Sequence, residues 1–159
     1  MKKILLLGGI GHGKTTFAKK LSKVTKIPCF ELDNVAFIDR KYYVKEPPKK
    51  RDNKLKKLLS EKKWIIEGAY SAKWTYPIFK DADKVIIINI NKLKAQKRVL
   101  TRYIGRRKVE SFKDMFYLLK HSWRYPKEYF IKQKEICKKF KIKPLILENQ
   151  KQINEFLKN

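Results

Sequence analysis

A glycine-rich stretch near the start of the chain, LLLGGIGHGKTT at residues 5–16, holds four of the six glycines in the sequence. Glycine costs backbone entropy, so such a cluster indicates a backbone that bends sharply or comes close to a bound group. The run from Gly8 to Thr15 fits the pattern G-x-x-x-x-G-K-[ST], and it lies between an apolar run and an amphipathic segment, as that motif requires. The motif predicts a loop that binds phosphate groups, whereas a plain turn would need only one glycine.

Each chemical group of this motif has its own task. Successive backbone N–H groups hold phosphates at the positive end of a helix. The Lys14 ammonium neutralises the β- and γ-phosphate oxygens, and the Thr15 hydroxyl binds Mg²⁺. We expect the His12 side chain to face solvent rather than to carry protons. The expected nucleotide-binding residues of the loop are Gly8, Gly9, Ile10, Gly11, His12, Gly13, Lys14, Thr15 and Thr16.

Two acidic residues stand at the ends of predicted strands. Asp33 follows the strand predicted at residues 28–32, and Glu67 lies in the run WIIEG at residues 64–68. Ligands of a parallel sheet meet the carboxyl ends of its strands, so both carboxylates are expected to face the phosphate loop. Asp33 is predicted to orient or deprotonate an acceptor hydroxyl, and Thr15, Asp33 and Glu67 to hold Mg²⁺ directly or through water. The alternatives are a helix cap for Asp33 and an ordinary solvent contact for Glu67.

The arginines are clustered, with five of the seven in one stretch of 27 residues. Arg98, Arg102 and Arg106 recur every four residues and so share one face of a predicted helix, where an anion would relieve the repulsion between them. We predict that Arg102 and Arg106 close over the nucleotide, with Gly105 as a hinge. Arg124 is predicted to stabilise the transferring phosphate. The simpler alternative is a solvated helix face.

The composition limits the class of protein. A length of 159 residues with 43% hydrophobic residues favours one domain with its own core. The formal net charge of +26 permits a nucleic-acid partner, but the lysines are spread almost evenly, which is typical of a solvated surface. No apolar run approaches the roughly 20 residues of a membrane span. We therefore expect a cytoplasmic protein with no membrane partner, and the sequence makes no prediction of its oligomeric state.

Alternating apolar runs and amphipathic segments predict βα units around a parallel sheet. The predicted strands are residues 2–8, 28–32, 64–68, 84–90 and 143–148. The predicted helices are residues 14–25, 52–63, 92–104, 112–123, 127–140 and 151–158, the third of them capped by Asn91. Residues 42–53, which contain two prolines, are expected to form a surface loop. The expected fold is a three-layer α/β/α sandwich with a five-stranded parallel sheet, in one domain over residues 1–159.

Other landmarks narrow the class of phosphate-loop protein. A GTPase carries Asp-x-x-Gly after a strand and Asn-Lys-x-Asp to recognise guanine, but in the run NKLK at residues 91–94 Lys94 takes the place of the aspartate. A large motor ATPase or a helicase would need a far longer chain. The sequence therefore favours a small phosphotransferase.

The remaining runs carry a resemblance. In chain order they are GIGHGKTTFAKKL, IPCFELDNVAF, WIIEGAY, ADKVIIINI, RVLTRYIGRR, RYPKEY and LILENQKQINEFL. The phosphate loop, RVLTRYIGRR and the five-strand order resemble the adenylate-kinase-like P-loop kinases. The runs other than RVLTRYIGRR, as an ordered set over nearly the whole chain, resemble the bacterial FlaR-type topology modulation proteins. The resemblance implies a P-loop NTPase fold of the nucleoside- or nucleotide-kinase type with a small lid. It also implies ATP with Mg²⁺ as cofactors, lid arginines at Arg102 and Arg106, and an effect on DNA.

The predicted function is an ATP-dependent kinase that transfers the γ-phosphate to a small acceptor, a nucleotide or a nucleoside. AMP is disfavoured, because LDNVAF and EGAYSAK lack the arginines that serve AMP in adenylate kinases. Residues 34–62 are expected to form an acceptor-binding insertion and residues 104–126 a lid. The alternatives are a nucleic-acid-associated, DNA topology-modulating ATP-binding protein and a nucleotide-binding module without catalysis. The predicted catalytic residues are Lys14, Asp33, Arg102, Arg106 and Arg124.

Overall fold

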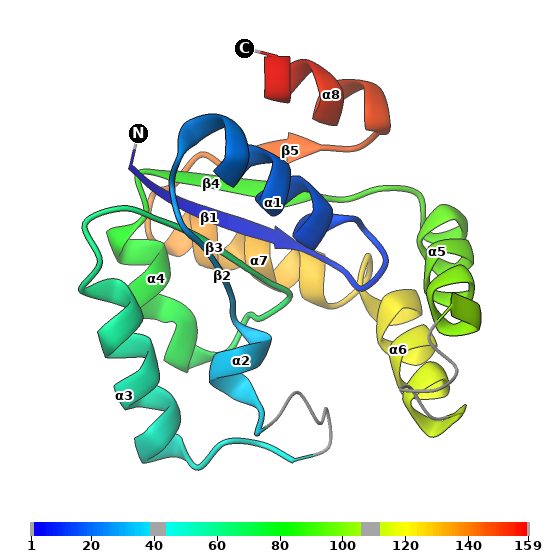
Figure 1. Cartoon of the computed structure of the whole chain (residues 1–159), viewed down its shortest axis with the longest axis horizontal. Coiled ribbons are helices and arrows are strands. Elements are labelled where there is room, and N and C mark those ends of the chain that lie inside the picture. Colours follow the sequence, from blue (N-terminus) through cyan, green and yellow to red (C-terminus); the bar gives the residue numbers. More distant parts are fainter. Residues whose placement is uncertain (1, 39–43, 106–111, 159) are drawn as a thin grey trace.

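Five strands form one parallel sheet in the order β2-β3-β1-β4-β5 (Figure 1). The structure is a computed structural model, and it describes residues 2–38, 44–105 and 112–158. The strands are β1 (Lys3–Gly8), β2 (Cys29–Glu31), β3 (Trp64–Gly68), β4 (Lys84–Ile88) and β5 (Leu145–Leu147). In the central register, Leu5 of β1 is paired with Ile66 on one side and Val85 on the other. The predicted five-stranded parallel sheet is confirmed.

The three central strands are apolar on both sides because helices cover both faces of the sheet. Leu5 and Leu7 of β1 pack into one core, and Ile4 and Leu6 of the same strand pack into the other. This alternation is the two-residue period of a strand. It explains why β1 reads as an unbroken apolar run in the sequence.

The helices form two layers around the sheet (Figure 1). The core on one face joins the sheet to α1 (Lys14–Thr25) and α8 (Gln150–Lys158). The core on the other face joins it to α3 (Pro48–Leu59), α4 (Tyr76–Asp81) and α7 (Tyr129–Lys139). The three-layer α/β/α sandwich is thereby confirmed.

Two further helices, α5 (Lys92–Gly105) and α6 (Phe112–Arg124), pack against each other near the carboxyl end of β1 (Figure 1). At the start of α5, the Asn91 side chain accepts a hydrogen bond of 2.9 Å from the backbone N–H of Leu93, as its predicted capping role requires. The predicted lid coincides with the end of α5 and with α6. Residues 106–111, which include Arg106, lie outside the described residues.

Three short helical segments and one helix start differ from the sequence expectation. Helix α3 begins at Pro48 rather than at Asp52, because proline suits the first turn of a helix, where its missing N–H would have no partner. Residues 48–53 are therefore helical, not part of a loop. The segments without a predicted helix are α2 (Asp33–Ala36), η1 (Lys73–Thr75) and α4. The predicted insertion, residues 34–62, thus contains most of α2 and all of α3.

None of the helices in the described ranges has both the length and the apolar character to cross a bilayer.

Candidate active site

A large cavity lies at the edge of the sheet where β1, β2 and β3 end. It has a volume of about 900 Å³. The phosphate loop and the start of α1 form one wall, the residues that follow β2 and β3 form the second, and α5, α6 and α7 form the rest. The predicted phosphate loop and both predicted carboxylates, Asp33 and Glu67, therefore line one space.

The phosphate loop has the backbone geometry that its glycines allow. Gly11 and Gly13 have φ angles of 80° and 84°, in the left-handed region that side chains rarely adopt. Gly9 lies so close to Tyr125 that an added Cβ would be 2.6 Å from the aromatic ring. All the predicted loop residues line the cavity except Gly8 and His12.

Lys14 and Thr15 follow the loop at the start of α1. The Lys14 Nζ donates a hydrogen bond of 3.0 Å to the carbonyl of Gly9, so the ammonium group lies at the loop itself. The Thr15 hydroxyl donates a hydrogen bond of 2.6 Å to Oε1 of Glu67. This contact joins the first turn of α1 to the end of β3.

Glu67 is a buried carboxylate, 5% exposed. Burial raises the pKa of its carboxyl above the usual value, and the Lys14 ammonium and the Thr15 hydrogen bond oppose that rise. The negative charge of Asp33 raises this pKa further, which places the two carboxylates within electrostatic reach of each other. A cation between them would stabilise both charges.

Asp33 faces the cavity from the first residue of α2. Its Oδ1 accepts a hydrogen bond of 2.7 Å from the Tyr70 hydroxyl, which follows β3. The alternative role of a helix cap is not seen, because Leu32 stands at the N-cap and no side chain caps this helix. Tyr70 thus combines packing against the core with a polar contact to Asp33.

The expectation that His12 faces solvent is wrong, because its side chain is 0% exposed. Its Nδ1 lies 2.9 Å from the carbonyl oxygen of Ile88 at the end of β4, and its ring packs edge-on against Tyr125. The pKa of His12 is lowered to about 4, mainly by burial; the hydrogen bond to Ile88 opposes this shift, and the charges of Lys14 and Arg98 add to it. The ring is therefore neutral at pH 7, and Nδ1–H donates to the carbonyl. His12 supports the loop from behind.

The predicted arginines have different positions. Arg102 lines the cavity from α5, together with Arg98 one turn earlier. Arg106 lies outside the described residues. Arg124, at the end of α6, donates two hydrogen bonds of 2.7 Å to the Glu128 carboxylate and is not among the residues that line the cavity. The structure thus brings Arg98 and Arg102 to the phosphate loop and pairs Arg124 with a neighbour.

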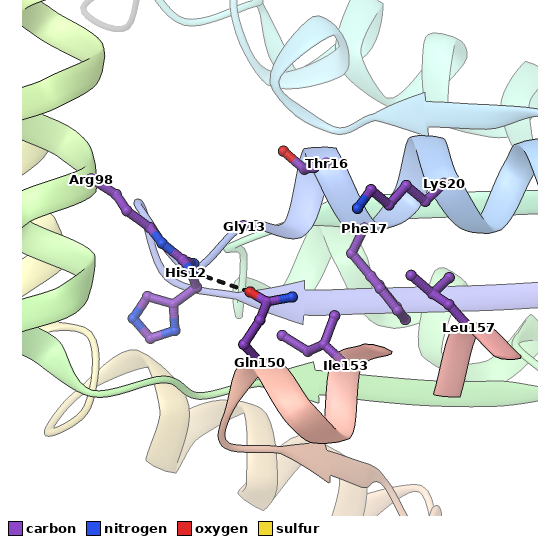
Figure 2. A pocket seen from close by; sticks show the side chains of 9 residues that line it. All are labelled: His12, Gly13, Thr16, Phe17, Lys20, Arg98, Gln150, Ile153 and Leu157. Atoms are coloured by element: carbon purple, nitrogen blue, oxygen red, sulfur yellow. Dashed lines mark hydrogen bonds between the residues drawn. The ribbon is translucent and has the colours of Figure 1, made fainter. Parts of the chain in front are cut away.

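A smaller cavity of about 160 Å³ lies behind the loop, between α1, α5 and α8. Figure 2 shows Arg98 reaching past Gly13 toward Gln150 of α8, and its Nη2 donates a hydrogen bond of 3.2 Å to Gln150 Oε1. Phe17, Ile153 and Leu157 give this cavity an apolar side. The cavity therefore offers the planar guanidinium of Arg98, the side-chain amide of Gln150 and apolar contacts close to the phosphate loop.

Sequence reasoning missed the wall that α6 and α7 contribute to the main cavity. Its residues are Tyr117, Leu118, His121, Tyr125, Tyr129 and Lys132. His121 Nδ1 and the Tyr129 hydroxyl lie 2.9 Å apart, and the Tyr117 and His121 rings have centroids 4.3 Å apart. Their spacing of three and four residues was visible in the sequence, but any packed helix has that spacing, so it does not mark a site.

Known proteins match this chain at the level of the nucleotide-binding core. A family model described as "ATPase family associated with various cellular activities (AAA)" matches residues 4–89. These residues run from β1 past the end of β4 and contain the phosphate loop, Asp33 and Glu67.

Individual relatives point to a kinase fold. A shikimate kinase of Flavobacterium johnsoniae is 58% identical over 33 residues, which are 21% of this chain and 19% of that protein. The structure of shikimate kinase from Acinetobacter baumannii in complex with shikimate has a TM-score of 0.64 at 19% identity, over 99% of this chain and 89% of that one. The YorR protein of Bacillus subtilis, in complex with phosphorylated GDP, has a TM-score of 0.60 at 21% identity, over 98% of this chain and 91% of that one.

The predicted P-loop kinase fold is thus confirmed. Because the family match covers more than half of the chain and includes the whole phosphate loop, this chain belongs to the AAA family of P-loop ATPases.

Proposed function

We propose that the protein is an ATP-dependent kinase that transfers a phosphoryl group to a small acceptor. The observation that carries the proposal is the shared cavity at the carboxyl edge of the sheet, where Lys14 and the Thr15–Glu67 pair lie at the phosphate loop and Asp33 lies nearby. A fold shared with shikimate kinases and membership of an ATPase family support it. The cavity volume of about 900 Å³ leaves room for an acceptor beside a triphosphate.

The phosphate loop is proposed to hold the β- and γ-phosphates through its backbone N–H groups, and Lys14 to neutralise their oxygens. Such chemistry depends on positioning and on charge stabilisation more than on covalent catalysis. Arg102, on the opposite wall, is placed to add positive charge as the phosphoryl group moves. We assign Arg106 and Arg124 to the same role in a lid over residues 104–126. For Arg124 this requires release from Glu128.

The oxygen donors at the loop fit Mg²⁺. This ion keeps several waters and binds through one or two carboxylates and the substrate phosphates rather than in an all-protein cage. Among the described residues no three His, Cys, Asp or Glu side chains are grouped closely enough to hold a metal alone. We assign Thr15, Glu67 and, through water, Asp33 to the ion. When bound, it would neutralise charge between the β- and γ-phosphates.

Asp33 is proposed to receive the proton of the acceptor hydroxyl. Tyr70 donates to Oδ1 and so fixes the carboxylate, while the second oxygen serves the acceptor. The same end of the cavity has aromatic walls from Phe37, Tyr117 and Tyr129, which suit a ring. We therefore propose a small ring-bearing alcohol as acceptor, held by residues 34–62. Shikimate, the ligand named with one of the similar structures, is of this kind.

The smaller cavity behind the loop is proposed to take the adenine base of ATP. It adjoins Gly13 and Thr16, so a base there would be continuous with phosphates on the loop. The Arg98 guanidinium would stack on the base, and Gln150 would hydrogen-bond its edge. This assignment leaves the larger cavity to the phosphates and the acceptor.

The decisive experiment measures ADP formed from Mg-ATP with a panel of hydroxyl compounds, including shikimate, nucleosides and nucleotides. Lys14→Ala should lower the rate by about 100-fold or more, because a cation at the transferring group is lost. Lys23→Ala is the matched control, since it removes an exposed ammonium from the same helix. Circular dichroism should show both variants folded.

The outcomes separate the alternatives. ATP binding without ADP formation for any acceptor would favour a module without catalysis. ADP formation that depends on DNA, with DNA affinity falling steeply as salt is raised, would favour the nucleic-acid-associated reading and the FlaR-type resemblance. An acceptor-dependent rate that survives Lys14→Ala would contradict the proposed role of the loop.

A further inference from the structure

Helix α6, which lines part of the main cavity, also contacts the phosphate loop through a residue that does not line it. The Ser122 hydroxyl donates a hydrogen bond of 2.9 Å to the backbone carbonyl of Ile10, and Ser122 is 0% exposed. Ile10 lines the main cavity, whereas Ser122 does not. The Ile10 carbonyl therefore points out of the phosphate site and into the end of α6, whose neighbourhood to the loop is visible in Figure 1.

Tyr125 makes a second buried contact with the phosphate loop. The Tyr125 ring packs on Gly9, and its edge-to-face contact with His12 has a centroid distance of 4.6 Å. The Tyr125 hydroxyl is itself anchored, since it donates a hydrogen bond of 2.7 Å to Gln133 of α7. The loop is thus held at Gly9 and His12 by the Tyr125 ring, which also lines the main cavity, and at Ile10 by Ser122.

The direction of the Ile10 carbonyl matters for anion binding. A loop binds phosphate when successive N–H groups point at the anion, and each carbonyl must then point away. A peptide unit that rotates inward replaces an N–H donor with a carbonyl oxygen, which repels phosphate. A glycine-rich loop has little intrinsic resistance to such a rotation, because glycine populates most backbone conformations. A hydrogen bond that holds the carbonyl outward supplies that resistance.

We propose that Ser122 is a positioning residue for the phosphate loop, and that its hydrogen bond to Ile10 keeps the loop in its anion-binding conformation. The proposal rests on the proposed use of this loop for a triphosphate. It gives α6 a role in phosphate affinity, although Ser122 touches neither nucleotide nor acceptor. Because Tyr117, Leu118 and His121 of α6 line the main cavity, an acceptor bound there would act on the helix that holds the loop.

Isothermal titration calorimetry with Mg-ATP and with inorganic tripolyphosphate tests the proposal. Ser122→Ala should weaken both ligands by about five- to thirtyfold, which corresponds to losing one hydrogen bond to a buried carbonyl. The affinity should fall by the same factor for both ligands, because the substitution weakens only the contacts between the loop and the phosphates. Ser122→Cys has a similar volume and a weaker donor, so it should give an intermediate loss and carries the test if the alanine variant does not fold.

Thr75→Val is the matched control. The Thr75 hydroxyl also donates to a backbone carbonyl, that of Ala72 at 2.7 Å, and Thr75 is 1% exposed. This variant should lose stability in thermal unfolding and keep wild-type affinity for both ligands. If Ser122→Ala and Ser122→Cys bind as the wild type does, or if Thr75→Val weakens binding equally, Ser122 has only a structural role. If the wild type binds neither ligand, the proposed function fails as well.

Discussion

His12 makes the stability of the fold depend on pH. Its ring is buried and neutral behind the phosphate loop, and its pKa is lowered from the usual 6.5 to about 4. A group with a depressed pKa binds fewer protons when the protein is folded, so its contribution to stability is complete above pH 6.5 and is lost as the pH falls toward 4. From these two pKa values, the loss between pH 7.5 and pH 5.0 is about 2 kcal/mol.

Other groups titrate in the same range, so the test compares variants. The raised pKa of Glu67 acts in the opposite direction, because stability from that group is lost as the pH rises. His121, the only other histidine in the sequence, also has a pKa lowered by burial and adds to the effect of His12. His12→Asn keeps an N–H donor for the Ile88 carbonyl and removes the titration, while leaving both other groups in place.

Urea unfolding at pH 7.5 and pH 5.0, followed by circular dichroism, measures the free energy of unfolding of each variant. Between the two pH values the wild type should lose about 2 kcal/mol more than His12→Asn, equivalent to about 4–8 °C in Tm for a chain of this size. His121→Asn is the control and should retain most of the wild-type loss, because His121 is less deeply buried. If His12→Asn and the wild type lose the same free energy, burial of a neutral His12 is not the cause.

Three further predictions concern the phosphate loop, the end of α5 and the proposed metal site. Gly9→Ala should lower stability by about 1–3 kcal/mol, because the new methyl group would lie 2.6 Å from the Tyr125 ring. Gly105→Ala should raise stability by about 0.5 kcal/mol, because no atom lies within 4 Å of a Cβ at this helical position. Thermal unfolding measures both changes. Equal Tm values for Gly9→Ala and Gly105→Ala would contradict the difference in packing at the two glycines. Glu67→Gln should raise the Mg²⁺ concentration for half-maximal ADP formation about tenfold or more. Glu148→Gln, at an exposed residue beyond the end of β5, should leave this Mg²⁺ concentration unchanged. If a magnesium titration gives the same value for both variants, Glu67 does not bind the ion.

The parts of the fold that the sequence could predict are those set by local pattern. Short apolar runs between amphipathic segments placed the strands to within two residues, and the phosphate loop followed from its glycine spacing. Asp33 and Glu67 could be assigned to one site because the carboxyl ends of parallel strands share an edge. Each of these inferences needs only neighbours in the chain and one general rule about sheets.

The parts that escaped prediction depend on contacts between distant segments. Nothing near His12 in the sequence indicates that Ile88 and Tyr125 bury its ring. The α6–α7 wall of the cavity is equally invisible, because its residues have the spacing of any packed helix. The pairing of Arg124 with Glu128 is different. It joins opposite charges four residues apart, so the sequence spacing alone indicated this ion pair as an alternative to a role of Arg124 in phosphoryl transfer.

The four clustered glycines serve two faces of the loop at once. Toward the cavity they leave room for a bound anion, but behind the loop an added Cβ would meet the Ile88 carbonyl at Gly8, the Tyr125 ring at Gly9 and the Ala95 carbonyl at Gly11. These neighbours come from β4, from the residue that follows α6 and from α5, so the fold itself holds the loop in shape. A binding loop that is already ordered loses less conformational entropy when it takes up its ligand. Substitutions at these glycines should therefore weaken the fold as well as phosphate affinity, whereas loss of the Lys14 ammonium should weaken phosphate binding alone.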